Sequence, residues 1–173
     1  MNIDPTLLAA QPFLKGLSKS QLELMSNNAM TVEFPAGKII FSEGLPANRF
    51  YVILKGEVAL ESAAAKKGGR AKLIQIIKAG DVLGWSWLFP PYKWNFDARA
   101  VKPTTAIIFF ATTLRKQCET NPAFGYDLMR RVSRVVITRL QATRHQVLKS
   151  TKKPAKPSPA APRQSLVQNV RRA

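Results

Sequence analysis

The sequence predicts an α+β chain in which about eight short strands form a β sandwich, jelly roll or barrel between two helical segments. From Thr31 to about Phe110, short apolar runs separated by Gly and Pro recur at regular intervals, as in antiparallel strands joined by turns. Before and after this region the apolar residues follow helical spacing. With 173 residues, 46% of them hydrophobic, the chain is long enough for one domain with its own core.

Residues 1–29 are expected to form a helical lead-in. Ser18 is a favourable N-cap, and Gln21 follows three positions later, which is the capping-box pattern. The apolar residues after Gln21 are mostly helix-spaced, so we expect a helix to begin at this cap.

Residues 30–110 carry the predicted strands. Turn residues such as those at 35–37, 44–46, 55–56 and 79–81 separate the apolar runs. The runs are 32–34, 39–41, 50–54, 58–60, 73–77, 82–83, 96–101 and 106–110.

Residues 111–148 return to a helical pattern. A short helix is predicted over 114–119, and Asn121-Pro122 marks a new start because Asn is a good cap and Pro suits the first helical position. The long helix that follows carries two neighbouring apolar lines. One line could pack on the β-domain and the other on a second copy of the chain, or both could pack inside one chain. We favour the dimer, because a small β-roll cannot cover both sides of so long a helix. The residues predicted for this dimer helix are Leu128, Val132, Val135, Val136, Leu140 and Val147.

The segment 34–60 resembles the opening half of cyclic nucleotide-binding domains. A glycine turn and an apolar pair precede an acidic-glycine corner, and a hairpin of the form Tyr-x-Ile-x-x-Gly-x-Val follows. A second matching block, Gly-Asp-Val-Leu-Gly, ends at Gly84. The matching positions are Gly37, Ile40, Phe41, Glu43, Gly44, Ala47, Tyr51, Ile53, Gly56 and Val58. The resemblance covers roughly residues 8–148. It implies an eight-stranded jelly roll with N-terminal helices and a long C-terminal helix, which is the dimerisation helix in Crp/Fnr regulators. The predicted domain is therefore 1–148.

The resemblance also implies a phosphate-binding cassette, in which family members hold the cyclic phosphate with an Arg and the ribose with a Glu. In this sequence Trp85 stands at the Glu position. Phe96 stands at the Arg position, or Asn95 if the register shifts by one. Asp97 beside this position would repel an anion. Arg99 is expected on the opposite face of the strand from Ala98. We therefore expect no binding of cAMP or cGMP in the usual geometry.

All three tryptophans lie between residues 85 and 94, and three interpretations stay open. The aromatic rings could stack a small flat ligand, they could fill the space of an absent nucleotide, or they could form an exposed patch for a partner protein. Apart from such a small flat ligand, no cofactor is predicted. The candidate pocket residues are Gly84, Trp85, Ser86, Trp87, Trp94, Phe96, Asp97, Ala98 and Arg99.

The formal net charge is +17, from 27 Lys and Arg against 10 Asp and Glu. Residues 149–173 are rich in Pro and Lys and contain no acidic residue, so we predict a disordered basic tail. Such a tail either contacts nucleic acid or another acidic partner, or only aids solubility. The tail residues predicted for an anionic partner are Lys149, Lys152, Lys153, Lys156, Arg171 and Arg172.

Composition argues against several classes of function. One His and one Cys in the chain leave no basis for a His/Cys metal site or a His-assisted nucleophile, so we expect no enzyme. The N-terminus lacks the pattern of a signal peptide, and no apolar run is long enough for a membrane span, which favours a cytoplasmic protein. Because only the tail follows the long helix, we expect no recognition helix. The sequence therefore predicts a regulatory or sensor module without sequence-specific transcription control. The alternative is a nucleic-acid- or nucleoid-associated protein that binds through its basic tail and the Arg-rich helix.

Overall fold

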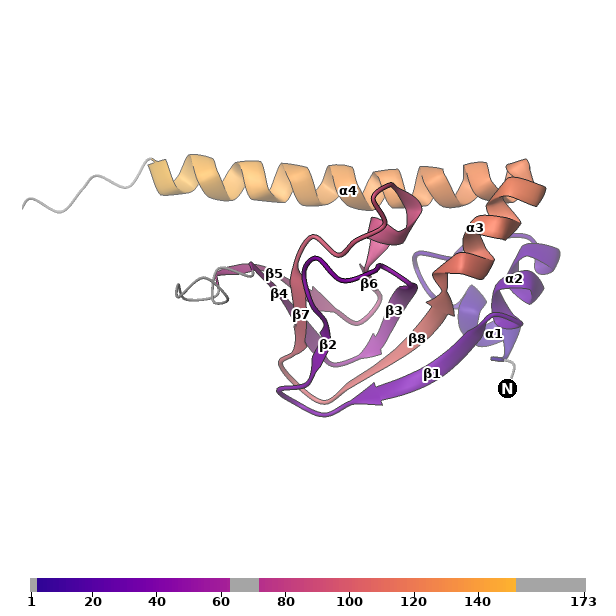
Figure 1. Ribbon diagram of the computed structural model, residues 1–173, viewed down its shortest axis with the longest axis horizontal. Helices are drawn as coiled ribbons and strands as arrows, with labels where there is room; N and C mark the ends of the chain where they lie inside the picture. The colour runs from indigo at the N-terminus through magenta and orange to yellow at the C-terminus, as the bar shows by residue number, and fades with distance from the viewer. Residues whose placement is uncertain (1–2, 63–71, 152–173) are drawn as a thin grey trace, which may run out of the picture. The chain divides into compact units, whose positions relative to one another are not determined.

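The computed structural model describes residues 3–62 and 72–151 (Figure 1). All eight predicted strands are present, at positions close to those expected. The strands are β1 Ala29–Phe34, β2 Ile39–Phe41, β3 Arg49–Lys55, β4 Glu57–Glu61, β5 Leu73–Lys78, β6 Val82–Leu83, β7 Asp97–Ala100 and β8 Thr104–Phe110. The helices are α1 Pro5–Ala9, α2 Lys19–Ser26, α3 Ala111–Thr120 and α4 Pro122–Thr151, with a short 3-10 helix, η2, over Trp85–Leu88.

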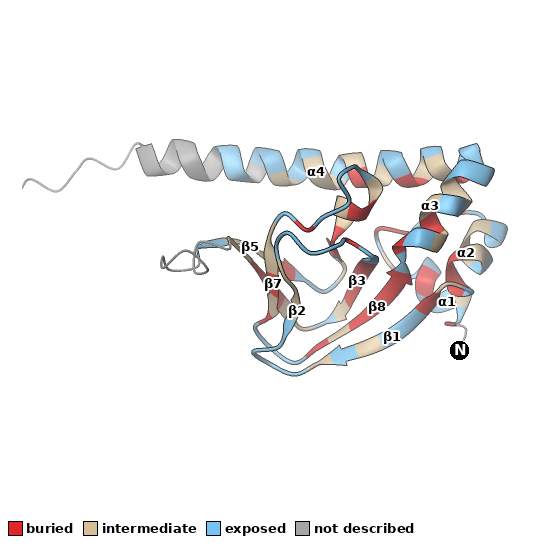
Figure 2. Cartoon of the chain, in the orientation of Figure 1, coloured by how far each residue is buried: buried red, intermediate tan, exposed pale blue. Residues whose placement is uncertain are grey.

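The strands form two four-stranded antiparallel sheets, with the orders β1-β8-β3-β6 and β2-β7-β4-β5. Buried positions concentrate on β3 and β8, as Figure 2 shows, and include Phe50, Ile53, Ile107 and Phe109. The apolar residues of the two sheets and of the flanking helices form one core. This arrangement confirms the predicted α+β jelly roll.

The helical lead-in contains two short helices. The capping box is confirmed, because Ser18 Oγ accepts a hydrogen bond from Gln21 N at 3.2 Å and Gln21 Oε1 accepts one from Ser18 N at 2.9 Å. Pro12 lies between α1 and α2, where its missing N–H disfavours a continuous helix.

Asn121 separates α3 from α4, as predicted, and its Oδ1 accepts a hydrogen bond from Phe124 N at 3.1 Å. The chain divides into two compact units, Met1–Ile137 and Thr138–Ala173. None of the helices among the described residues is both long enough and apolar enough to cross a membrane.

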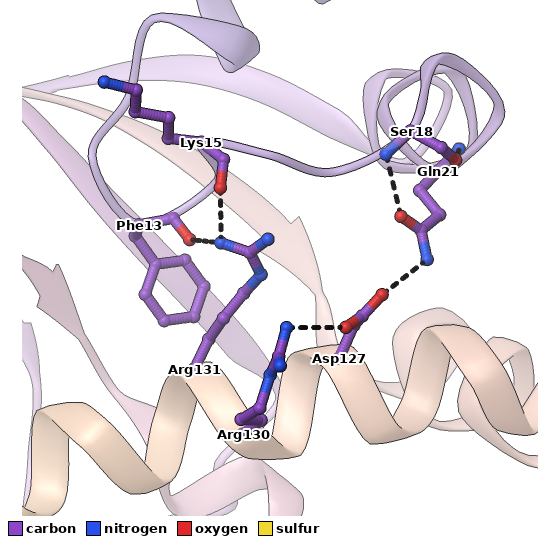
Figure 3. Close-up of polar contacts among 7 residues, drawn as sticks. All are labelled: Phe13, Lys15, Ser18, Gln21, Asp127, Arg130 and Arg131. Carbon is purple, nitrogen blue, oxygen red and sulfur yellow. Dashed lines mark hydrogen bonds and ion pairs between the residues drawn. The ribbon is translucent and has the colours of Figure 1, made fainter.

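In the first unit, α4 is fixed to the lead-in by a polar cluster (Figure 3). Arg131 Nη1 donates to the carbonyl oxygens of Phe13, at 2.8 Å, and Lys15, at 2.9 Å. Asp127 accepts hydrogen bonds from Gln21 at 3.1 Å and from Arg130 at 3.2 Å. These bonds hold one face of α4 against the domain.

The six residues predicted for a dimer helix divide into different environments. Leu128 and Val132 are fully buried within their own chain, and Val135 and Val136 are half-buried against the core. Leu140 is 68% exposed. The side chains of Val147 and Lys149 lie outside the described residues, as does the chain from residue 152 onward. The tail is predicted to begin at residue 149, whereas α4 extends to Thr151.

Candidate ligand site

The candidate ligand site is the cassette, residues 84–96, which connects β6 through η2 to β7. It contains or adjoins all nine predicted pocket residues. Gly84 to Trp87 lie at or in η2, Trp94 and Phe96 lie in the following loop, and Asp97, Ala98 and Arg99 belong to β7. The structure therefore gathers these residues on two neighbouring segments but gives their side chains different surroundings.

Trp94 packs directly on the backbone of Gly84. Gly84 has a φ of +81°, and a Cβ at this position would lie 2.8 Å from the Trp94 ring, so a larger residue would be both strained and obstructed. The Trp94 side chain is 4% exposed and stacks on Phe41 of β2, with ring centroids 4.0 Å apart. Tyr51 of β3 is a further neighbour, at 6.5 Å. An indole ring of the same chain thus lies against the N-cap residue of η2.

The other two tryptophans differ in exposure. Trp87 is fully buried and lies 6.0 Å from Phe50, between ring centroids. Trp85 is half-buried and meets Phe89 edge-on at 6.4 Å. Phe89 and Tyr92 are 39% and 40% exposed. Two of the three tryptophans therefore belong to the core, while the outer side of the cassette carries partly exposed rings.

The charged residues of β7 are engaged with the protein. Asp97 Oδ1 accepts a hydrogen bond from Glu43 N at 2.7 Å, which ties β7 to the acidic-glycine corner. The Arg99 guanidinium hydrogen-bonds and ion-pairs with Glu61 on β4, and this hydrogen bond raises the pKa of Arg99. Ala98 is fully buried while the Arg99 side chain is 38% exposed, so the two residues face opposite sides of the sheet, as predicted.

Neither Asn95 nor Phe96, the two residues predicted for the position of the family's Arg, offers a cation. Asn95 Nδ2 donates to Ser86 Oγ at 3.2 Å, which links the end of the cassette to η2. Phe96 is partly buried and packs against the core. Lys93 is exposed, and its backbone forms an isolated antiparallel β-bridge with Pro46.

Sequence reasoning missed Arg115 of α3. Its Nη1 donates to the backbone oxygen of Trp87 at 2.9 Å, and its guanidinium lies 4.5 Å from the centre of the Tyr92 ring. No pattern in the sequence pointed to this residue, because α3 approaches the cassette only in the folded chain. Over residues 3–62 and 72–151, no group of three or more His, Cys, Asp or Glu side chains could hold a metal ion.

The two sheets, the short helix after β6 and the long helix after β8 define the class of cyclic nucleotide-binding domains. Residues 31–121, more than half of the chain, match the family described as cyclic nucleotide-binding domain. The chain belongs to this family.

Individual relatives agree with this assignment. A CRP-like cAMP-activated global transcriptional regulator of Mycobacterium tuberculosis is 27% identical over 128 residues, which are 74% of this chain and 56% of the regulator. The chain thus spans just over half of the length of this relative.

Solved structures of two bacterial proteins also resemble this chain. A candidate cyclic nucleotide-binding protein from Geobacter metallireducens GS-15 is 30% identical, with a TM-score of 0.73, and the match covers 80% of this chain and 98% of that one. The sensor domain of the transcriptional regulator DNR from Pseudomonas aeruginosa has the same fold, with a TM-score of 0.62 at 20% identity over 75% of this chain and 91% of that domain.

Proposed function

We propose that this chain is a non-enzymatic regulatory module whose cassette does not bind cAMP or cGMP in the usual way. The observation that carries the proposal is the position of Trp94. Its indole lies against Gly84, the N-cap of η2, and stacks on Phe41, so it occupies the space beside the start of the short helix. Backbone N–H groups at such a turn can hold a phosphate only if they are accessible to it.

The charge of the cassette supports the same proposal. A cyclic phosphate needs a cation or several aligned N–H donors. Phe96 and Asn95 supply no charge at the position where the family has Arg, and the guanidinium of Arg99 is directed to Glu61 instead. Asp97, the next residue, carries a carboxylate whose Oδ1 accepts a hydrogen bond from Glu43 N. Asn95, Phe96 and Arg99 therefore leave an anion without the charged partner that the family's Arg supplies.

Of the three interpretations of the aromatic residues, the buried tryptophans favour the one in which the rings fill the space of a nucleotide. A flat ligand in this position would have to displace Trp94 from Phe41 and would lose a stacked pair whose rings are 15° from parallel. Phe89 and Tyr92 are partly exposed on the cassette. A partner protein would therefore contact the cassette at these two rings.

Calorimetric titration with cAMP and cGMP tests the proposal. We expect no binding heat from the natural chain. The triple variant Trp85→Glu, Phe96→Arg and Trp94→Ala should bind cyclic nucleotide, because it restores both charged contacts and uncovers Gly84. The double variant Trp85→Glu, Phe96→Arg, which keeps Trp94, is the matched control and should show no binding heat with either nucleotide. Circular dichroism verifies folding, since removing a buried Trp costs about 3–5 kcal/mol. Tight binding of cAMP by the natural chain would contradict the proposal.

We further propose that the module is a dimer held by α4. The outward side of the helix carries large exposed apolar residues at helical spacing, in contrast to the buried line at Leu128 and Val132. The exposed fractions are 68% for Tyr126, 39% for Met129, 54% for Ile137 and 68% for Leu140. A second copy of the same helix supplies a matching apolar surface.

Association with nucleic acid is the second candidate function. Arg134 and Arg144 are exposed on α4, whose sequence contains Asp127 as its sole acidic residue. Fluorescence anisotropy with a labelled DNA duplex at several salt concentrations tests this function. We expect an affinity that falls steeply with salt and weakens when Arg134 and Arg144 are both changed to Gln. Deleting residues 152–173 separates the contribution of the tail. Failure to bind DNA at low salt would contradict this candidate.

A further inference from the structure

We propose that Arg115 is a positioning residue that fixes the cassette to α3. The inference concerns the same site as the proposed function, but it does not depend on whether a nucleotide binds. It rests on two contacts that one guanidinium makes with two separate points of the cassette.

The first contact is with the backbone of η2. Carbonyl groups in the last turn of a short helix lack partners within the helix and form its negative end. Phe89 N donates to Ser86 O, whereas Trp87 O accepts from Arg115 Nη1 at 2.9 Å. Trp87 itself is fully buried, so this charge-assisted bond serves a carbonyl of a residue in the core.

The second contact is with Tyr92, whose ring centre lies 4.5 Å from the Arg115 guanidinium. Tyr92 has a φ of +54°, the single non-glycine residue in the described part of the chain with a positive φ. Such a conformation is strained for a bulky side chain and persists where its surroundings hold it. The backbone of Tyr92 is held as well, because its oxygen accepts a hydrogen bond from Ala47 N at 2.7 Å.

Arg115 projects from a helix that is firmly anchored. Ala111 and Leu114 of α3 are fully buried, and Ala111 N donates to Asn48 O at 3.1 Å. At the start of α4, Gly125 lies so close to Cys118 that a Cβ would be 2.9 Å from the Cys118 carbonyl oxygen. A displacement of η2 or Tyr92 must therefore either break the Arg115 contacts or move α3, which packs closely on the first turns of α4.

The variant Arg115→Met tests the proposal, because methionine keeps an unbranched side chain but has no charge and no donor. Lys116→Met, an exposed change on the next residue of the same helix, is the matched control. Hydrogen exchange measured by NMR resolves the amides of residues 85–89 and 92 from those of β3 and β8; residues 90 and 91 are prolines without an amide hydrogen. We expect exchange in the cassette to rise about tenfold or more in Arg115→Met, with β3 and β8 unchanged and Lys116→Met like the natural chain.

Two further variants separate the contacts. Arg115→Lys keeps a charged donor for Trp87 O and should retain part of the protection. Tyr92→Leu removes the aromatic face alone and should raise exchange around residue 92 more than in η2. Unchanged cassette exchange in Arg115→Met would overturn the proposal. So would a rise of equal size in the cassette, β3 and β8, because that pattern reports general destabilisation of the domain. Nucleotide titration is a separate measurement, so failure here leaves the proposed function to be judged by itself.

Discussion

Asp97 and Arg99 are neighbours on β7, yet each serves a different part of the fold. Asp97 fixes the corner at Glu43, and Arg99 pairs with Glu61 on the adjacent strand. Asn95, just before them, bonds to Ser86 on η2. At the scale of the residue, the polar groups around the cassette thus bind the protein itself, which is the physical basis for proposing that they do not bind a nucleotide.

The pair of Glu57 and Lys102 makes stability depend on pH. Lys102 Nζ lies 2.7 Å from Glu57 Oε1, and this hydrogen bond holds the pKa of Glu57 below its ordinary value. Because the pKa is lower in the folded chain than in the unfolded chain, the stabilisation is present above the ordinary glutamate range. It is lost as the pH falls through the lowered pKa.

We predict that Lys102→Met lowers the free energy of unfolding at neutral pH but has little effect in acid, where Glu57 is protonated in both proteins. Urea unfolding at neutral pH and at about pH 2, below the ordinary glutamate pKa, measures the difference. The effect is expected to be small because Lys102 is 61% exposed. An equal loss of stability at both pH values would show that Lys102 acts through packing instead.

At the scale of the element, the burial of residues on the helix α4 differs from what its sequence pattern alone indicates. In the sequence its two apolar lines look equivalent. In the structure, Phe124, Leu128 and Val132 are fully buried against the domain, and Arg131 and Asp127 fix the helix to the lead-in. On the other line Met129 and Leu140 are exposed and Val136 is half-buried, so the structure distinguishes residues that pack within the chain from residues that lie at the surface.

We predict that Leu140→Glu weakens the proposed dimer at least about tenfold, a loss of about 1.4 kcal/mol, because it places two carboxylates in an apolar contact. Sedimentation equilibrium over a range of concentrations measures the dissociation constant. Gln141→Glu is the control, since it adds the same charge at the next, exposed position. A chain that stays monomeric at every concentration contradicts the dimer, and a Leu140→Glu variant that dimerises normally contradicts the assigned surface.

The cassette is the second element in which local pattern and final structure differ. The short helix begins after Gly84 and involves Trp85, Ser86, Trp87 and Leu88, as a match to the family's cassette suggests. Its three nearby tryptophans nevertheless have three environments: half-buried for Trp85, buried beside Phe50 for Trp87, and stacked on Phe41 for Trp94. Spacing along the chain could not distinguish these environments.

At the scale of the whole molecule, local signals predicted the order of the elements well. Turn residues between apolar runs located eight strands, and Ser18 and Asn121 located two helix starts, because these features depend on neighbouring residues. The single helical lead-in of the prediction contains two helices. The tail residues predicted to contact an anion, from Lys152 onward, lie outside the described residues.

The sequence by itself determined the fold family and the strand positions. These follow from residue identity and short-range spacing. Only the tertiary structure decided that Trp94 covers Gly84, that Arg99 pairs with Glu61, and that Arg115 reaches Trp87 and Tyr92. Each of these contacts joins segments far apart in the chain. Their partners are set by how the sheets and helices pack, which local sequence pattern does not specify.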